Sequence, residues 1–407
     1  MDKNSLTRRL FLPKRRQAAA LQNRTNFGSV CYACAFQSRT PSPHLIFPSF
    51  HDSRMHILIV KLSSIGDVVH AMPAAAALRA SFPEARLTWV VERIAAPLLI
   101  GSPILDEVIV LDTRGWRKRL ADGNTWASIR KQIKELRQFP VDVALDFQGL
   151  FKSAGVGILA GATQRIGFSS NALREPACRF GYTRQIEVDN AHHVIENNLA
   201  LATAIGAEMP VRYEFPFPAL DEETAAIRTQ LERHDIDQFV ILNPGGGWVT
   251  KLWPAAEYGR LANEIWKRFR VKSIVTCGPG EEKMAETITA ASRHAVYFPT
   301  SLREFIVLVR QAELFVGSDT GPLHLAAACR TPIVGIYGPT APERNGPFNL
   351  NDRTIGLDIP CRLNCHRRTC NNHICMNIPL ESVLQAVENR IDTSKFLFSP
   401  VPSGQGR

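Results

Sequence analysis

The alternation of short apolar runs with helical patterns constrains the fold of this chain most strongly. From Met55 onward, runs of four to six apolar residues are separated by longer segments with helical spacing. Strands that alternate with helices favour parallel sheets covered on both faces. We therefore predict an α/β protein. The strands that we expect lie at 55–60, 87–91, 107–111, 141–146, 239–242, 274–276, 313–317 and 333–336.

The chain is long enough for two domains. Its 407 residues are 45% hydrophobic, which allows two cores of ordinary size. A proline-bearing stretch, with a short helix expected from Asp221 to Arg233, separates the two series of strands. We predict the following parts: a basic extension (1–54), a first domain (55–210), a connector (211–237), a second domain (238–395) and a tail (396–407).

The first 54 residues are interpreted as a disordered extension, or as the product of a start codon assigned too far upstream of Met55. They hold nine Lys or Arg against two Asp, so they carry +7 of the formal net charge of +10. The body is only weakly basic, which argues against a nucleic-acid partner. Arg8-Arg9 lacks the apolar segment of a twin-arginine export signal. No apolar run is long enough to cross a bilayer.

The segment from Asp319 to His324 places an acid, a hydroxyl, a bare backbone and an imidazole where a strand becomes a helix. Thr320 and Gly321 are expected at the helix N-terminus, where backbone N–H groups and the helix dipole favour a phosphate. Asp319 at the strand end and His324 one turn later are placed to meet a sugar. A simple capped turn is the alternative for this segment alone.

A second strand-to-helix turn of the same type occurs about 75 residues earlier. The run that ends in Asn243 is followed by three glycines, which allow a ligand to approach the backbone closely. Lys251 supplies a positive charge suited to a diphosphate. Two such turns in one series of strands and helices indicate opposite sides of one nucleotide pocket. Glu281 or Glu282, after the next strand, would hold the ribose, and the sequence does not decide between them.

The first strand is followed by a carboxylate and not by a dinucleotide fingerprint. The segment after Val60 contains no Gly-x-Gly-x-x-Gly, which argues against a nicotinamide-dependent dehydrogenase. Asp67 follows a glycine at an expected helix start, where the dipole keeps an acid ionised as a general base requires. The competing interpretation is that Asp67 only caps the helix.

Five segments together resemble the lipopolysaccharide heptosyltransferases, with heptosyltransferase I the most similar type. They occur in order between about residues 55 and 390, and five collinear motifs are more specific than any single one. Cysteine-bearing tails like the one described below are more typical of the heptosyltransferase II group, so that type is the alternative. The segments are 61–68, 146–153, 174–176, 251–254 and 319–324.

The resemblance implies a GT-B fold, in which two Rossmann-like domains face each other across a cleft. It implies inverting, metal-independent transfer of heptose from ADP-heptose to Kdo of the lipid A core, with no cofactor. The enzyme would be monomeric and cytoplasmic, in peripheral contact with the inner membrane. Asp67 would be the base, and the donor would be bound by Asn243, Lys251, Glu281 or Glu282, Asp319, Thr320, Gly321 and His324.

Basic residues in the first half are candidates for binding the anionic acceptor. A loop is expected after Leu111, and its clustered cations would steer an anionic lipid headgroup, although such clusters are commonly only solvated surface. The matched segments add further residues to the same hypothesis. The acceptor candidates are Lys61, Ser63, Ser64, Arg114, Arg117, Lys152 and Arg174.

Four cysteines near the C-terminus have no assigned role. Zinc binding, disulfides and free thiols all remain open. Their spacing does not match paired Cys-x-x-Cys knuckles, and a reducing cytosol disfavours disulfides, so we expect no metal. The residues are Cys361, Cys365, Cys370 and Cys375, with His366 and His373 among them.

Overall fold

Two six-stranded sheets with the same strand order form the framework of the protein. The computed structural model describes residues 55–119, 121–362, 365 and 367–392, which belong to one compact unit. The first sheet has the order β3-β2-β1-β4-β5-β6, and the second has β12-β11-β10-β7-β8-β9. All neighbouring strands are parallel. Each sheet is therefore a Rossmann-like doubly wound sheet, as predicted.

The strands follow the apolar runs of the sequence. In the first sheet they are β1 (His56–Val60), β2 (Arg86–Glu92), β3 (Glu107–Leu111), β4 (Val143–Asp146), β5 (Gln164–Phe168) and β6 (Arg184–Ile186). In the second they are β7 (Phe239–Asn243), β8 (Lys272–Val275), β9 (Ala295–Tyr297), β10 (Leu314–Ser318), β11 (Ile333–Ile336) and β12 (Arg353–Ile355).

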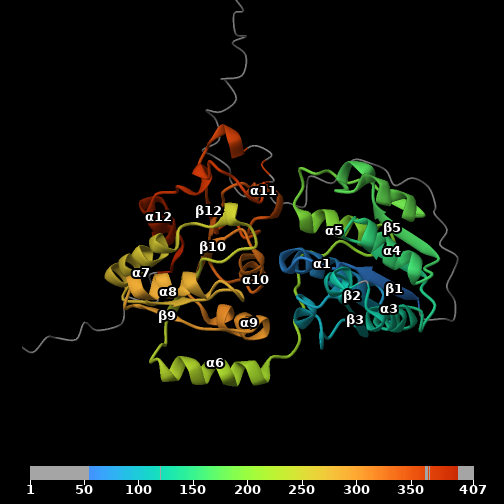
Figure 1. Cartoon of the computed structure of the whole chain (residues 1–407), viewed down its shortest axis with the longest axis horizontal. Coiled ribbons are helices and arrows are strands. Elements are labelled where there is room, and N and C mark those ends of the chain that lie inside the picture. Colours follow the sequence, from blue (N-terminus) through green and yellow to red (C-terminus); the bar gives the residue numbers. More distant parts are fainter. Residues whose placement is uncertain (1–54, 120, 363–364, 366, 393–407) are drawn as a thin grey trace, which may run out of the picture. The chain divides into compact units, whose positions relative to one another are not determined.

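Helices connect successive strands (Figure 1). Those of the first half are α1 (Ile65–Ser81), α2 (Thr113–Lys118), α3 (Gly123–Leu136), α4 (Phe151–Leu159) and α5 (Val194–Thr203). The helix α6 (Asp221–Arg233) has the bounds expected for the connector. Those of the second half are α7 (Ala255–Phe269), α8 (Glu282–Ala291), α9 (Leu302–Gln311), α10 (Gly321–Ala328), α11 (Pro342–Asn345) and α12 (Leu380–Arg390). The short 3-10 helices are η2 (Ala96–Leu98), η3 (Ser170–Ala172), η4 (Pro176–Gly181), η5 (Val249–Lys251), η6 (Pro360–Arg362) and η7 (Ile374–Met376).

One local prediction was wrong: the basic residues after Leu111 lie mainly on a helix and not in a loop. Asp112 precedes α2, and its Oδ1 accepts a hydrogen bond from the Gly115 backbone N at 3.0 Å. This bond caps the helix start and lets the short segment turn helical. The cations Arg114, Arg117 and Lys118 therefore lie within one and a half turns of helix.

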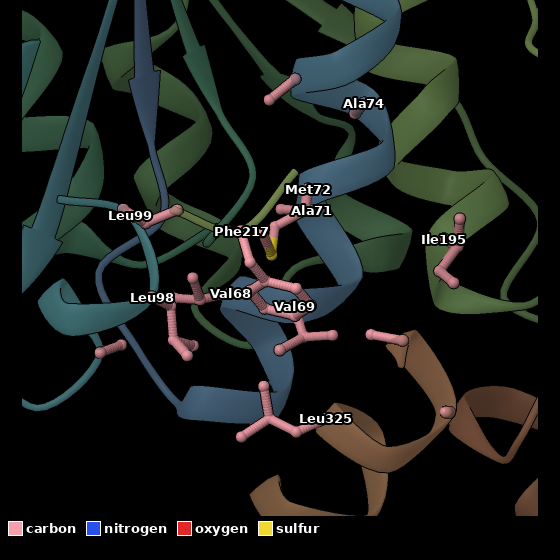
Figure 2. Packing of buried hydrophobic residues seen from close by; sticks show 14 of the residues in the cluster. Val68, Val69, Ala71, Met72, Ala74, Leu98, Leu99, Ile195, Phe217 and Leu325 are labelled. Carbon is pink, nitrogen blue, oxygen red and sulfur yellow. The ribbon is translucent and has the colours of Figure 1, made fainter. Parts of the chain in front are cut away.

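Alternate residues of the central strands enter different cores. Ile57 and Ile59 of β1 face the largest hydrophobic cluster, whereas Leu58 and Val60 face a smaller one. Residues of α1, α5 and α10 meet in the largest cluster, and Figure 2 shows Val69, Ile195 and Leu325 among them. The helix that follows β1 and the helix that follows β10 are thus packed through one core.

No helix among the described residues is both long enough and apolar enough to cross a membrane.

Candidate functional site

Each sheet reverses its strand order at one point, and the predicted residues follow the strands on either side of it. The reversal lies between β1 and β4 in the first sheet and between β7 and β10 in the second. Ligands of open α/β sheets bind beyond the carboxyl ends of strands at such a point. Asp67 follows β1, while Lys251 follows β7 and Asp319 follows β10.

Asp319 is the centre of a hydrogen-bond network and is 2% exposed. Its Oδ2 accepts from Lys251 Nζ at 2.6 Å and from Thr340 Oγ1 at 2.7 Å. Its Oδ1 accepts from Asn345 Nδ2 at 3.0 Å, and His324 Nε2 lies 3.2 Å away. A carboxylate has about four lone-pair sites, so these four contacts fill them. This geometry indicates that Asp319 orients the four side chains that contact it.

The contacts of Asp319 also fix its charge. Burial by itself would raise the pKa of this carboxyl, but His324 and Lys251 outweigh burial and hold the pKa well below its usual range. Lys251 Nζ donates a second bond to the backbone O of Asp319 at 2.9 Å and lies 4.8 Å from the centre of the Trp248 ring. The cation predicted to meet a diphosphate is therefore already paired with an acid.

The glycine-rich loop after β7 is braced by Glu281. One carboxylate oxygen of Glu281 accepts from Gly246 N at 2.8 Å, and the other accepts from Gly278 N at 2.7 Å. A Cβ at Gly245 would lie 1.9 Å from Glu281 Oε2, so a side chain at this position would displace the Glu281 carboxylate. Glu282 is exposed, and its side chain accepts from Gly280 N at 3.0 Å. Glu281 thus joins two loops of the candidate donor site, whereas the described bond of Glu282 lies within its own loop.

Asn243 ties the end of β7 to the neighbouring strand. It is buried, and its Nδ2 donates to the backbone O and Oγ1 of Thr276 at 2.9 and 3.0 Å. Its Oδ1 is buried without a hydrogen-bond partner among the described residues. Asn243 therefore stabilises the loops on which the donor candidates lie.

Thr320 and Gly321 start α10 as predicted. Thr320 is the N-cap and makes no capping hydrogen bond with its side chain. A Cβ at Gly246 would lie 2.9 Å from Thr320 Cγ2, so the two turns approach each other closely. Backbone N–H groups at the start of α10 and the glycine-rich turn are thus neighbours, which suits a phosphate group.

Asp67 lies in the first turn of α1 and is half-buried. Its Oδ2 accepts from the backbone N and the Oγ of Ser64, at 2.8 and 2.9 Å. Asp67 therefore helps to cap the helix, as the alternative interpretation expected. Burial would raise the pKa of this carboxyl, but Lys61, Ser64 and His324 outweigh burial and lower it. The group is ionised at neutral pH, as a general base requires.

The segment before Asp67 is held by the segment that follows β4. Lys61 is buried and its Nζ donates to the Phe147 backbone O at 2.7 Å. Burial lowers the pKa of Lys61. Gln148 Oε1 accepts from the backbone N atoms of Leu62 and Ser63, each at 3.1 Å. These bonds position Ser63 and Ser64 beside the candidate base.

Lys61, Ser63 and Ser64 follow β1, and the other acceptor candidates lie after β3, β4 and β5 of the first sheet. Lys152 Nζ is 3.4 Å from Oε1 of Glu92, a buried acid that also accepts from Thr113 Oγ1. Arg117 and Arg174 are exposed. Arg114 lies on α2. Among the candidates after β3, β4 and β5, the structure thus places Lys152 on a buried carboxylate and Arg117 and Arg174 at the surface.

The starts of α1 and α10 pack directly against each other. A Cβ at Gly66 would lie 2.3 Å from His324 Cδ2, and a Cβ at Gly321 would lie 2.9 Å from Ile65 Cβ. Both positions therefore require glycine. This contact brings the helix turn that bears Asp67 to the turn that follows Asp319.

Several residues of the network were missed from the sequence. Thr340 and Asn345 contact Asp319 from the segment after β11, Gln148 holds the segment before Asp67, and Glu92 pairs with Lys152. Gln148 had a signal, because it lies in the matched segment 146–153. The others are polar residues of ordinary spacing that only the tertiary fold brings together.

The cysteine-rich segment carries no described metal cluster. Cys361 and Cys370 are exposed, and Cys365 and Cys375 are partly buried; all four are free thiols. Within the ranges that the structure describes, no three His, Cys, Asp or Glu side chains are placed to share a metal. His366, the extension 1–54 and the tail from 396 lie outside the described residues.

A cavity of about 390 Å³ lies away from this site, at the amino ends of the strands of the first sheet. It is lined in part by His56, Arg86, Asp106 and Asp142. Asp106 pairs with Arg79, and Asp142 accepts from the His56 backbone N at 2.8 Å. These charged groups already have partners in the fold.

Comparisons with known proteins agree with the arrangement of the two sheets. The model of glycosyltransferase family 9 (heptosyltransferase) matches residues 129–375. Lipopolysaccharide heptosyltransferase 1 of Pseudomonas aeruginosa is 30% identical over 322 residues, which cover 78% of this chain and 87% of the relative. The structure of Escherichia coli heptosyltransferase WaaC with ADP has a TM-score of 0.68 at 24% identity and covers 82% of this chain and 99% of its own.

A second structure of the same Escherichia coli enzyme, with ADP-2-deoxy-2-fluoro heptose, has a TM-score of 0.66 at 24% identity and the same coverage. Because the family model matches more than half of the chain, the assignment does not depend on one relative. The predicted GT-B architecture is confirmed by these neighbours. The chain belongs to glycosyltransferase family 9 and is a heptosyltransferase of lipopolysaccharide core biosynthesis.

Proposed function

We propose that the protein transfers heptose from ADP-heptose to Kdo of the lipid A inner core, with inversion and without a metal ion. The observation that carries the proposal is the meeting of two turns: the start of α1 with Asp67 packs against the start of α10 after Asp319. A base on one sheet and an anion-binding turn on the other are the two parts that an inverting transfer requires. The domain bounds 55–210, 211–237 and 238–395 remain part of this proposal.

The donor would bind at the second sheet. The turns after β7 and β10 adjoin, and the N–H groups at Thr320 and Gly321 would bind the diphosphate. Structures of the Escherichia coli relative contain ADP and a fluorinated ADP-heptose, which supports a nucleotide-sugar donor. Glu281 joins the two adjacent loops and is our choice for the ribose.

The chemical step follows from the two carboxylates. The acceptor hydroxyl attacks the anomeric carbon from the face opposite ADP, and Asp67 takes its proton as the new bond forms. A carboxylate of low pKa suffices, because the acceptor hydroxyl becomes acidic only as its oxygen bonds to the anomeric carbon. Such a base increases the rate by about 10²- to 10⁴-fold. The helix N-terminus at Gly321 and Lys251 would stabilise the charge of the leaving ADP.

The acceptor would bind at the first sheet. Its phosphates and Kdo carboxylates are anionic, and exposed cations on α2 and α3 give that side a positive surface. The same surface would bring the protein into peripheral contact with the inner membrane from the cytoplasm. The exposed residues are Arg117, Lys118, Arg119, Arg130, Lys131, Lys134 and Arg137.

The test is a product assay with two acceptors. The protein from Met55 onward is incubated with ADP-heptose and deacylated Kdo-lipid A, or with the same acceptor already carrying one heptose. We expect ADP release and a product heavier by one heptose with the first acceptor, in EDTA as well as without it. A product only from the second acceptor would indicate the heptosyltransferase II type. Inactivation by EDTA that magnesium or manganese reverses would contradict the metal-free mechanism.

A further inference from the structure

Three histidines from three helices meet beside the candidate site. His70 lies on α1, His193 is the N-cap of α5, and His324 lies on α10. The ring centre of His70 is 4.4 Å from that of His324 and 5.6 Å from that of His193. His70 is 4% exposed and His324 is 6% exposed. Buried imidazoles in edge contact are polar groups that a hydrophobic core would not select by itself.

His324 and His193 are both linked to Asp319. His324 Nε2 lies 3.2 Å from Asp319 Oδ1. His193 Nε2 donates to the Gly346 backbone O at 3.1 Å, and the preceding residue, Asn345, donates to Asp319 Oδ1. A closed ring of contacts therefore runs from Asp319 through His324, His70, His193 and the end of α11 back to Asp319.

His70 is also joined to the turn that bears the candidate base. Gly66 and His70 are four residues apart, so they lie on one face of α1. Both contact His324, because a Cβ at Gly66 would clash with the His324 ring. Asp67 is the next residue after Gly66. The His324 ring thus occupies a space bounded by the first two turns of α1.

The charges around the cluster keep its centre neutral. Burial, together with His324, His193 and Lys61, holds the pKa of His70 well below its usual value, and Asp319 opposes them only in part. Burial also lowers the pKa of His193, although Gly346 and Glu196 oppose it. Among the charged groups near this cluster, Asp67 interacts electrostatically with His324, and Lys251 pairs with Asp319. His324 Nδ1 is buried without a hydrogen-bond partner among the described residues.

We propose that His70 is a positioning residue of the transferase: its ring holds His324 in place and thereby sets the Asp67 turn of α1 against the Asp319 network. The inference rests on the proposed function and adds to it a residue that touches neither substrate. His193 completes the arrangement by holding the α11 end that carries Asn345. A displacement of about 1 Å between base and donor can lower the rate by about 10²-fold. The His70 ring, which sets the spacing between α1 and α10, therefore affects turnover.

The test compares His70→Ala with His70→Phe, and uses His192→Ala as the matched control, because His192 is exposed next to the cluster. Single-turnover transfer is measured with ADP-heptose and deacylated Kdo-lipid A, and ADP affinity is measured by calorimetry. We expect His70→Ala to lose about 10- to 100-fold in rate. ADP affinity should stay within about threefold, because the nucleotide contacts lie on the loops after β7 and β10. His70→Phe should regain most of the rate, since it restores a ring of similar size.

Two results would overturn the inference. One is a His70→Ala protein that folds and transfers heptose within about threefold of the parent. The other is a loss of ADP affinity as large as the loss of rate. If the parent itself transfers no heptose, the proposed function fails, whereas an active parent with an equally active variant rejects only the role of His70.

If His70→Ala does not fold, selective ¹⁵N-histidine labelling of the unaltered protein supplies a second test. At pH 6, the neutral form of His70 is expected. A protonated His70 ring at that pH would contradict a spacer packed against His324.

Discussion

The two sheets share one strand order, yet they hold their candidate acids in different ways. Asp67, after β1, receives both of its described hydrogen bonds on one oxygen from one residue, Ser64. Asp319, after β10, is contacted on both oxygens by four side chains from three segments. A saturated carboxylate organises its partners, whereas a carboxylate held at one oxygen can still accept a proton. The same sheet topology would thus hold a proton acceptor, Asp67, in the first half and a carboxylate that positions its neighbours, Asp319, in the second.

The cations of the two regions also differ in how they are paired. Asp319 is paired with Lys251, so the donor side gains little net positive charge from that lysine. The diphosphate would then be attracted mainly by the backbone N–H groups at the start of α10. On the acceptor side Arg117 and Lys118 of α2 are exposed, where they could meet an anionic headgroup. Binding of the donor should therefore depend less on salt than binding of the acceptor.

The largest expected effect is that of Asp67→Ala. Loss of the base should lower kcat by about 10²-fold or more, while donor affinity stays close to that of the parent. Loss of the bonds from Ser64 should also cost about 1 kcal/mol of stability. Steady-state kinetics and chemical unfolding measure the two effects.

The matched control is Asp122→Ala, since Asp122 caps α3 by accepting from Asn124 N at 3.0 Å. It should lose similar stability and retain activity. If Asp67→Ala behaves like this control, Asp67 is only a helix cap.

Lys251→Ala should have the next largest effect. It leaves the buried Asp319 carboxylate without its cation, and breaking a buried pair costs about 3 kcal/mol or more. The uncompensated negative charge would also repel the diphosphate, so donor affinity and turnover should both fall, by about tenfold or more. Calorimetry with ADP and initial rates provide the measurement. Unchanged ADP affinity would show that Lys251 does not influence the diphosphate.

The double change Arg117→Ala with Lys118→Ala should have a smaller effect, confined to the acceptor. Exposed charges contribute little each, so the acceptor KM should rise by about two- to fivefold at low salt. The difference should shrink at high ionic strength because salt screens exposed charges. A KM equal to that of the parent at low salt would remove α2 from the acceptor site.

The smallest expected effect is that of His70 on the pH dependence of the unfolding free energy. The pKa of His70 is lowered in the folded protein, so the unfolded chain binds the proton more tightly. The contribution of His70 to folding is therefore complete above its unfolded pKa of about 6.5 and is lost as the pH falls below that value. Asp319 acts in a separate window, because its lowered pKa makes its contribution fall only below about pH 4.

His70→Phe should consequently flatten the decline of the unfolding free energy between pH 7 and 5. Urea unfolding at four pH values measures it. An unaltered slope in that window would show that His70 does not stay neutral in the fold.

Much of this arrangement could be predicted from the sequence, because it depends on local patterns. The apolar runs of β3 and β11 and the helix α6 have the predicted bounds. Four strands were missed. β6, β9 and β12 are edge strands of three residues, which carry no periodic signal, and β5 (Gln164–Phe168) is short and begins with two polar residues. The only sequence signal for helix α2 and its cations was Asp112, the residue that caps this helix.

The main residues of the candidate site could be predicted from the sequence, but the contacts between them could not. Asp67, Lys251 and Asp319 stand beside glycines at strand ends, which sequence patterns can mark. The contact of Asn345 with Asp319 and the meeting of His70 with His324 depend on how separate helices pack. No spacing within the chain specifies such contacts. The saturation of Asp319 is for this reason a finding of the structure.

The division of roles between the two acids is tested most directly by measuring ADP-heptose affinity and single-turnover rate for Asp67→Asn and Asp319→Asn side by side. The account predicts that Asp67→Asn binds the donor within about threefold of the parent and transfers heptose at least about 10²-fold more slowly. Asp319→Asn should lose both affinity and rate, because its amide repels Lys251 and His324 or leaves them unpaired. An Asp67→Asn protein with a normal rate, or an Asp319→Asn protein with normal donor affinity, would contradict the account.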